Sequence, residues 1–384
     1  MPATRSAVPY RARATSGGTL VADTGAAVRV DAAGEAPRLW FPRADVDAAA
    51  LESLGTGAWR AGEGDLAGHV AFDHDQVELV LVDARDGEDE RDVTTKRFPT
   101  WGDAADLLAV LDIRPDGARR YRGEARADWR RPVVEGSQML GQAIVAAGRH
   151  APGRRAVAAS MVFTRAADAR EPYAIELDEV SAGRTFTALA ARAVQGGRTC
   201  AAGTLLLDAT APDVIRHADA APDVPGPYEA VSFDMAVTGR DLRVVDGAYT
   251  GDPDAPVGPP ELAAWVRFRD VPDDPPLHAG LLGQFTGHMP IAAALRPHPG
   301  VGQDQAHRTL STAINAISLS LHAEVRADRW LLYHHRSTFA GDGMTHAECR
   351  VYDEDRGLVA SFTVDAMVRA FADPARSPDE RTAL

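Results

Sequence analysis

The order of the predicted elements repeats along the chain, and this repeat limits the possible folds more than any other feature. Residues 136–150 (GSQMLGQAIVAAGRH) have the apolar spacing of a long helix, and four strand-like runs separated by glycine turns follow up to residue 209. A second helix is predicted over residues 278–295 (HAGLLGQFTGHMPIAAAL), with strands on both sides of it. A helix and an antiparallel sheet that occur twice predict two similar α+β halves packed side by side.

The other patterns divide the chain into shorter segments. The first residues carry Arg but no apolar run, so we expect a disordered arm and no secretory signal there. Short alternating runs between Gly, Pro and Asp predict a small β-rich domain with one helix at 105–113. The predicted segments are the arm at 1–17, the β-rich domain at 18–115, the first half at 118–208, a Pro- and Asp-rich linker at 209–227, the second half at 228–372 and a polar tail at 373–384.

Charge and cysteine content exclude several classes of function. With 55 acidic and 41 basic residues the chain has a formal net charge of −14, which does not fit a nucleic-acid-binding protein. No apolar run reaches the ~18 residues that suggest a membrane span, so we expect no membrane partner. Cys200 and Cys349 lie in strand-like runs and are predicted to be core residues, and the absence of a CxxC motif favours a reducing cytoplasm.

Three stretches carry a resemblance to a known family: GSQMLGQA at 136–143, RADRWLLY at 326–333 and GLVAS at 357–361. Over residues 119–371 the chain resembles the acyl-CoA thioesterase II family, which has the pattern GGQxxGQA at the first stretch. The resemblance implies a double hotdog fold, in which each antiparallel sheet wraps one helix and Gly141 lets the first helix approach its sheet. It also implies a cytosolic enzyme that hydrolyses acyl-CoA without a metal or cofactor. The expected fold is an α+β double hotdog preceded by a small β-rich domain.

A second, shorter resemblance lies in the N-terminal domain. The stretch at 21–46, which ends in WFPRADV at 40–46, resembles a small bacterial domain of unknown function, which carries no agreed chemistry. We expect Trp40, Phe41 and Trp59 to be core aromatic residues.

The positions at which the family activates water are occupied differently here. The family uses an Asp on the second central helix, a Thr or Ser on the next strand and a Gln on the last strand, which together hold a water for attack on the thioester. These positions fall at Gly287, Ile314 and Val364. A glycine has no side chain that can take a proton, so hydrolysis by the family's own residues is not expected.

Nearby polar residues are candidates for a replacement site. His288 has the ordinary pKa of a base that works near neutral pH, or it packs near the helix start without chemistry. Glu135, before the first helix, is a second candidate base, or a charge that complements the helix dipole. Thr286 is the third candidate catalytic residue. The candidate substrate-binding residues are Gln138, Gln142, Gln284, Gly287, Ser318 and Ser320, and the two serines are predicted to share a strand face with Ile314.

Three functions remain open from the sequence. They are a thioesterase-like enzyme with a rewired site that acts on acyl-CoA or an acyl carrier thioester, a non-hydrolytic hotdog enzyme (dehydratase, isomerase or cyclase), and a non-catalytic acyl-thioester-binding or scaffold protein. No metal site is predicted, because His334 and His335 face opposite sides of a strand and have no nearby Asp or Cys at metal spacing. We also expect a pocket between the halves and a homo-oligomer.

Overall fold

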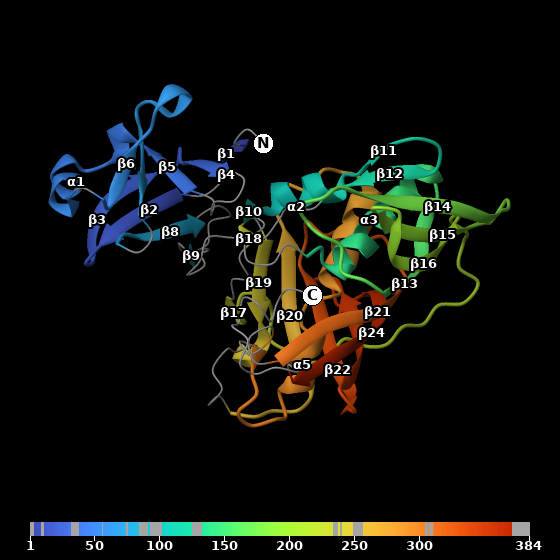
Figure 1. The fold of residues 1–384 in the computed structure, drawn as a ribbon. Coiled ribbons are helices and arrows are strands. Elements are labelled where there is room, and N and C mark those ends of the chain that lie inside the picture. Colours follow the sequence, from blue (N-terminus) through green and yellow to red (C-terminus); the bar gives the residue numbers. More distant parts are fainter. Residues whose placement is uncertain are drawn as a thin grey trace. The chain divides into compact units, whose positions relative to one another are not determined.

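The chain forms two compact units in a computed structural model (Figure 1). Unit 1 contains residues 1–103 and 234–239, and unit 2 contains residues 104–233 and 240–384. The predicted boundary near 115 is therefore wrong. The structure describes residues 4–8, 11–31, 38–55, 57–73, 76–83, 91–92, 102–124, 133–232, 237–238, 240–248, 256–303, 306 and 310–370, so the predicted tail at 373–384 lies outside the described residues.

Unit 2 is built on one 13-stranded sheet in the order β11-β12-β14-β15-β16-β13-β21-β24-β23-β22-β20-β19-β17 (Figure 1). Strands β13 and β21 join the two halves in antiparallel fashion, with Ser160 opposite Ser318. The predicted pair of antiparallel halves is confirmed. The strands are β11 Arg114–Pro115, β12 Arg120–Gly123, β13 Arg155–Phe163, β14 Tyr173–Ala182, β15 Phe186–Gln195, β16 Arg198–Asp208, β17 Val231–Ser232, β19 Arg240–Val244, β20 Glu261–Phe268, β21 Leu310–Leu321, β22 Leu331–Gly341, β23 Met344–Tyr352 and β24 Leu358–Ala370.

The inner face of this sheet contacts two helices that cross each other, α3 (Gly136–His150) and α4 (Pro275–Phe285). A Cβ placed on Gly141 would lie 2.6 Å from the carbonyl oxygen of Gly280, and one on Gly280 would lie 3.1 Å from the carbonyl oxygen of Gly141. Gly141 therefore allows contact between the helices. The expectation that it allows contact between helix and sheet is wrong, because the motif alone did not show which neighbour its bare face meets.

We expect Gly141→Ala to lower the free energy of unfolding by about 1–3 kcal/mol, because the added methyl group overpacks a backbone contact that cannot rotate away. The measurement is equilibrium denaturation. Gly183→Ala is the matched control, since its Cβ would lie at an ordinary 3.5 Å from the carbonyl oxygen of Phe186. Equal stability of Gly141→Ala and the wild type would show that the helices can move apart without cost.

The second predicted helix, 278–295, is interrupted. α4 ends at Phe285, and α5 (Pro290–Leu295) begins after Met289, whose φ is 70°. Pro290 has no N–H and restricts the residue before it, so the helix cannot run through this point. Residues 286–289 consequently form a loop at the end of α4, and this loop carries three of the candidate site residues.

Helix α2 (Ala104–Leu111) belongs to unit 2, although this segment was predicted to be part of the N-terminal domain. It contacts α3 and α4, and Leu107 and Leu111 are fully buried. The amide of Gln142 in α3 donates a hydrogen bond to the Val110 carbonyl at 2.9 Å. An apolar helix face must be covered, and the two crossing helices cover this one.

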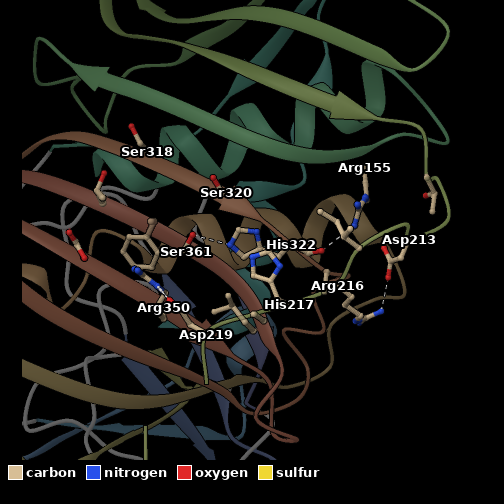
Figure 2. Close-up of a pocket in the computed structure, with 18 of the residues that line it drawn as sticks. Arg155, Asp213, Arg216, His217, Asp219, Ser318, Ser320, His322, Arg350 and Ser361 are labelled. Atoms are coloured by element: carbon tan, nitrogen blue, oxygen red, sulfur yellow. Dashed lines mark hydrogen bonds and ion pairs between the residues drawn. The ribbon is translucent and has the colours of Figure 1, made fainter. Parts of the chain in front are cut away.

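The linker has no helix or strand, as predicted, but side chains of the second half hold its later part. The Arg356 guanidinium donates to the carbonyls of Pro222 (3.0 Å) and Val224 (2.8 Å), and the Tyr352 hydroxyl donates to that of Ala220 (3.1 Å). We call residues 210–219, the part before this anchor, the strap. Figure 2 shows strap residues Asp213 to Asp219 beside the outer face of the sheet.

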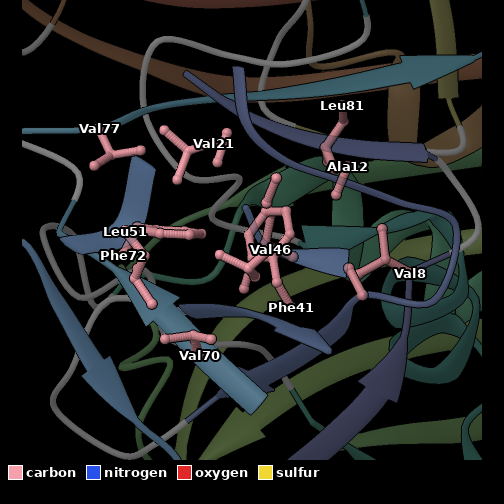
Figure 3. Packing of buried hydrophobic residues seen from close by; sticks show 14 residues of the cluster. Val8, Ala12, Val21, Phe41, Val46, Leu51, Val70, Phe72, Val77 and Leu81 are labelled. Carbon is pink, nitrogen blue, oxygen red and sulfur yellow. The ribbon is translucent and has the colours of Figure 1, made fainter. Parts of the chain in front are cut away.

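Unit 1 has two small sheets, in the orders β1-β4-β5-β7-β6 and β3-β2-β8-β9, around a core that includes Phe41, Leu51 and Phe72 (Figure 3). A short parallel pair, β10 with β18, adds residues 237–238 to it. The elements are β1 Thr4–Ala7, β2 Arg11–Ser16, β3 Thr19–Thr24, β4 Val28–Asp31, β5 Arg38–Pro42, α1 Ala48–Leu54, β6 Trp59–Ala61, β7 His69–Phe72, β8 Glu78–Asp83, β9 Arg91–Asp92, β10 Gly102–Asp103 and β18 Val237–Thr238.

The predicted disordered arm at 1–17 is wrong. It contains β1 and β2, and Ala12 and Ala14 of β2 are fully buried in the core of unit 1. Trp40 and Phe41 are core residues as predicted, and Trp59 packs against the same cluster. In unit 2, Cys200 and Cys349 are buried free thiols, also as predicted. No helix within the described residues is long and apolar enough to cross a membrane.

Candidate functional site

The three positions where the family keeps its catalytic side chains carry no functional group here. A Cβ on Gly287, just after α4, would lie 4.0 Å from the side chain of Ile314, so these two positions are neighbours. Val364 is buried on the inner face of β24. The adjacent Asp365 faces outward, where its Oδ1 lies 2.7 Å from Nδ1 of His346. None of these three positions can supply a base.

Ser137 fills the space beside Gly287. A Cβ on Gly287 would lie 2.5 Å from the Oγ of Ser137 and 2.8 Å from its Cβ, closer than real side chains approach. Ser137 is 2% exposed and stands in the first turn of α3, at a position where the family motif has glycine. Ser137 was not among the site residues predicted from the sequence. The paired change, glycine to serine at 137 and aspartate to glycine at 287, was the signal that could have identified it.

Glu135 and Gln284 meet at the same helix crossing, from opposite helices. Glu135 is the N-cap residue of α3, and its exposed carboxylate accepts a hydrogen bond from Nε2 of Gln284 in α4 at 3.3 Å. Gln284 is 1% exposed, and its Oε1 has no hydrogen-bond partner within the described part of the chain. A buried amide oxygen without a donor is costly, so this atom is suited to accept a hydrogen bond from a water or a ligand.

His288 lies near this crossing but is poorly suited to the predicted role of general base. Its ring stacks on Phe285, with centroids 4.7 Å apart and an interplanar angle of 3°. Burial, followed by the charge of Arg240, lowers the pKa of His288 to about 3. A base whose conjugate acid is so acidic accepts a proton weakly at neutral pH. The structure therefore argues against His288 as the base.

Thr286, the third predicted catalytic residue, uses its hydroxyl within its own helix end. It is fully buried, and Oγ1 donates a hydrogen bond to the carbonyl of Gly283 at 2.6 Å. This local bond is the usual alternative for a threonine near a helix terminus. Thr286 does not present its hydroxyl to a substrate in this arrangement.

Gln138 and Gln142, predicted to bind substrate, form a buried network that holds the first half together. Nε2 of Gln138 donates to the hydroxyl of Tyr173 at 2.9 Å, and that hydroxyl donates to Oε1 of Gln142. Both amides also donate to the carbonyl of Glu124, at 3.1 and 3.0 Å. These contacts tie α3 to β14 and to the chain after β12, so the two glutamines have a structural use.

The prediction that Ser318 and Ser320 share a face with Ile314 is wrong. The pairing of β21 with β24 shifts between Ile314 and Ala316, and such a bulge reverses the alternation of side chains. Ile317 is consequently buried on the inner face, and Ser318 is exposed on the outer face, where its hydroxyl lies 3.0 Å from that of Ser160. The two serines cannot contact a ligand at the helix crossing.

His335 is a second buried imidazole near His288. It is fully buried on β22, and neither ring nitrogen has a hydrogen-bond partner among the described residues. Burial, then the charges of His334 and His288, lower the pKa of His335 to about 3. The imidazole therefore stays neutral in the folded protein over the ordinary pH range.

Acid should destabilise the protein through His335. Because the unfolded pKa is about 6.5, the unfolded chain binds one more proton than the folded chain between pH 6.5 and the folded pKa. The free energy of unfolding should fall by about 1.4 kcal/mol per pH unit below 6.5 from this residue. Urea denaturation of the wild type and of His335→Leu at pH 7 and pH 5 measures this. An identical pH dependence of both proteins would contradict the assignment.

No three or more His, Cys, Asp or Glu side chains in the described ranges are grouped as metal ligands.

Comparison with known sequences identifies the family. The model of the acyl-CoA thioesterase N-terminal domain matches residues 125–207, and that of the C-terminal domain matches residues 212–368. Acyl-coenzyme A thioesterase 8 of Mus musculus is 24% identical over 295 residues, and that of Homo sapiens is 24% identical over 305 residues. Each match covers 70% of this chain and 91% of the relative.

Solved structures share the fold of unit 2. The acyl-CoA thioesterase II TesB2 from Mycobacterium marinum is 26% identical with a TM-score of 0.58, and the match covers 69% of this chain and 99% of that chain. The tesB protein from Mycobacterium avium subs paratuberculosis is 23% identical with a TM-score of 0.57, covering 69% and 98%. The two family domains together cover more than half of the 384 residues and coincide with the two halves of the sheet. The chain therefore belongs to the acyl-CoA thioesterase II-like double hotdog family of thioester hydrolase-like enzymes.

Proposed function

We propose that the protein hydrolyses an acyl thioester of coenzyme A at the crossing of α3 and α4, with Glu135 as the base that activates water. The observation that carries this proposal is the hydrogen bond from Gln284 to Glu135, which holds a carboxylate of the first half against the second half at 3.3 Å. The carboxylate that the family keeps at the end of α4 is thereby replaced by one at the start of α3.

Gln284 supports this role in two ways. Its Nε2 fixes one oxygen of Glu135, and its unpaired Oε1 can accept a hydrogen bond from the same water that Glu135 deprotonates. A carboxylate and an amide that hold one water reproduce the kind of groups lost at Gly287 and Val364. Of the three predicted catalytic residues, Glu135 is the best candidate for the base. This residue is exposed, whereas the Thr286 hydroxyl donates to a carbonyl of its own helix and His288 is a weak base.

The reaction then follows ordinary acyl-transfer chemistry. Glu135 takes a proton from water as the oxygen forms a bond to the thioester carbonyl carbon. The N–H groups of Gly136 and Ser137 precede the first hydrogen bonds of α3, which Gln138 and Met139 donate to the carbonyl of Glu135, and the positive end of the helix dipole favours the developing oxyanion there. The tetrahedral intermediate collapses as the C–S bond breaks, and the thiolate leaves and takes up a proton. The products are a carboxylic acid and the free thiol. The names of the relatives support coenzyme A as the carrier.

A binding protein without turnover is the second candidate. The loss of functional groups at Gly287, Ile314 and Val364, and the filling of the space beside Gly287 by Ser137, favour it. Such a protein would keep the fold and the acyl-thioester affinity but would release no thiol.

The test is thiol release from short-, medium- and long-chain acyl-CoAs by the purified wild-type protein, with mass spectrometry of the acyl product. Release of free thiol with free acid supports hydrolysis. A retained thioester with an altered acyl chain would replace the proposal by non-hydrolytic chemistry. Binding of an acyl-CoA in calorimetry with no change of any substrate would replace it by the binding function.

A further inference from the structure

A cavity lies on the opposite side of the sheet from the helix crossing. It has a volume of about 1080 Å³, is open to solvent, and lies between the strap and the outer face of β13, β21, β23 and β24 (Figure 2). Ser318 and Ser320 line it, whereas the neighbouring Ile317 and Leu319 are buried on the inner face. Because a sheet separates them, this cavity and the helix crossing cannot bind the same small molecule at one time.

The floor of this outer cavity carries several hydroxyl groups on β21 and β24, with the carboxylate of Glu348 on β23 opposite Thr363. Ser318 and Ser320 of β21 lie beside Ser361 and Thr363 of β24, since Ser318 is opposite Thr363 and Ser320 is opposite Ser361 in the strand register. The Ser361 hydroxyl lies 2.9 Å from Nε2 of His322 (Figure 2). Hydroxyl groups both donate and accept hydrogen bonds, so this floor suits a ligand that carries several polar groups.

The two aspartates of the strap form hydrogen bonds with nearby arginines. Asp219 accepts a hydrogen bond from Arg350 at 3.0 Å, and Asp213 accepts one from Arg216 at 2.9 Å. These pairs leave the acidic groups of the strap occupied by arginines.

Arg155 differs from these arginines. Its Nη1 lies 3.5 Å from the carbonyl oxygen of His322, and its Nη2 lies 3.9 Å from Asp208, so both contacts are long. Its side chain is 45% exposed and lines the cavity near Ser320 and His322. A guanidinium presents five N–H donors in a planar fork that matches a phosphate group. The end of the cavity at Arg155 is therefore rich in donors that have no short acceptor in the protein.

We propose that this outer cavity binds a small organic phosphate, with the phosphate group on Arg155 and the hydroxyl or amine groups of the ligand on the serine and threonine floor. The volume of about 1080 Å³ is slightly above the ~300–1,000 Å³ typical of small-molecule pockets, enough for a nucleoside monophosphate or a sugar phosphate. This site is separate from the proposed thioester site, and the proposal does not depend on hydrolysis.

The experiment is isothermal titration calorimetry of the full chain with three probes: inorganic phosphate, AMP and ribose 5-phosphate. We expect the two organic phosphates to bind more tightly than inorganic phosphate, because only they reach the floor. Arg155→Met should weaken the binding of all three probes at least about tenfold, which is the loss of one charge-assisted contact of roughly 1.4 kcal/mol. Ser320→Ala should weaken the organic phosphates and leave inorganic phosphate nearly unchanged.

Arg192→Met is the matched control, because Arg192 has a similar exposure of 48% and lies on β15, outside the residues that line the cavity. Thermal unfolding of each variant shows whether it is folded. The proposal is overturned if no probe binds at millimolar concentration, or if Arg192→Met weakens binding as much as Arg155→Met does. Equal affinity for inorganic and organic phosphates would overturn the role assigned to the floor.

Discussion

The Glu135→Gln variant is expected to release thiol from acyl-CoA at least about 100-fold more slowly than the wild type, because a general base contributes typically 10²–10⁴-fold. Gln has the shape of Glu and can still accept the hydrogen bond from Gln284, but it cannot take a proton from water. The loss should therefore appear in kcat, with KM nearly unchanged. The measurement is steady-state thiol release with the substrate that the wild type uses best.

A purely structural role for Glu135 makes a different prediction. A negative charge at a helix N-terminus contributes about 0.3–1 kcal/mol to stability, so its loss would lower the melting temperature slightly and leave kcat unchanged. Glu63→Gln is the matched control, since Glu63 is likewise an N-cap residue, of the 3-10 helix Gly64–Leu66, but belongs to unit 1. A His288→Asn variant that abolishes turnover while Glu135→Gln retains it would transfer the role of base to His288.

Gly287→Asp should lower the free energy of unfolding by about 2–4 kcal/mol, because the new side chain would collide with Ser137 and place a carboxylate in a nearly closed space. The Ser137 hydroxyl can rotate away, but its Cβ, 2.8 Å from the new Cβ, cannot. Adding Ser137→Gly should recover most of this loss. The two substitutions should therefore be coupled by more than about 1 kcal/mol in a double-mutant cycle measured by denaturation.

The repeat of the fold supplies the control for this cycle. Gly148, near the end of α3, faces the first turn of α4 as Gly287 faces the first turn of α3, and a Cβ on Gly148 would lie 2.8 Å from Pro276. Gly148→Asp should be destabilising too, but Ser137→Gly should not rescue it. Additive effects of Gly287→Asp and Ser137→Gly would show that Ser137 does not occupy the position of the missing carboxylate. With the base restored at 287, the double variant should also regain thiol release in a Glu135→Gln background.

The central elements followed from local patterns. The helix predicted over 136–150 has those bounds in the structure, and the four strands predicted after it are β13 to β16. Besides the two-residue β11, strands β12 and β19 of unit 2 were not predicted. Their sequences, RYRG and RDLRV, are rich in charge, and β19 is buried only because the chain around it covers its charged side chains. The prediction of a disordered arm at 1–17 was wrong for a related reason. In RARATS the residues facing the core are alanines, whose apolar signal is weak.

Most of the candidate residues were identified from the sequence, but the sequence did not show which groups their side chains contact. Gln138 and Gln142 were predicted to bind substrate. In the structure both side chains form hydrogen bonds with the hydroxyl of Tyr173. Ser318 and Ser320 lie on the opposite face of β21 from the one predicted. The reason is one bulge in the strand, which a strict period of two residues cannot anticipate. Both errors concern where a side chain points, and that direction depends on partners far away in the sequence.

The sequence by itself determined the repeat, the first central helix and the loss of the family's catalytic side chains, because apolar periodicity and residue identity are local properties of the chain. Only the tertiary structure decided that Ser137 fills the space beside Gly287 and that Glu135 meets Gln284 across 149 residues. These two contacts arise where α3 and α4 cross, and the crossing is set by the fit of Gly141 against Gly280. Close packing between distant segments chose the partners, and no pattern within either segment records that choice.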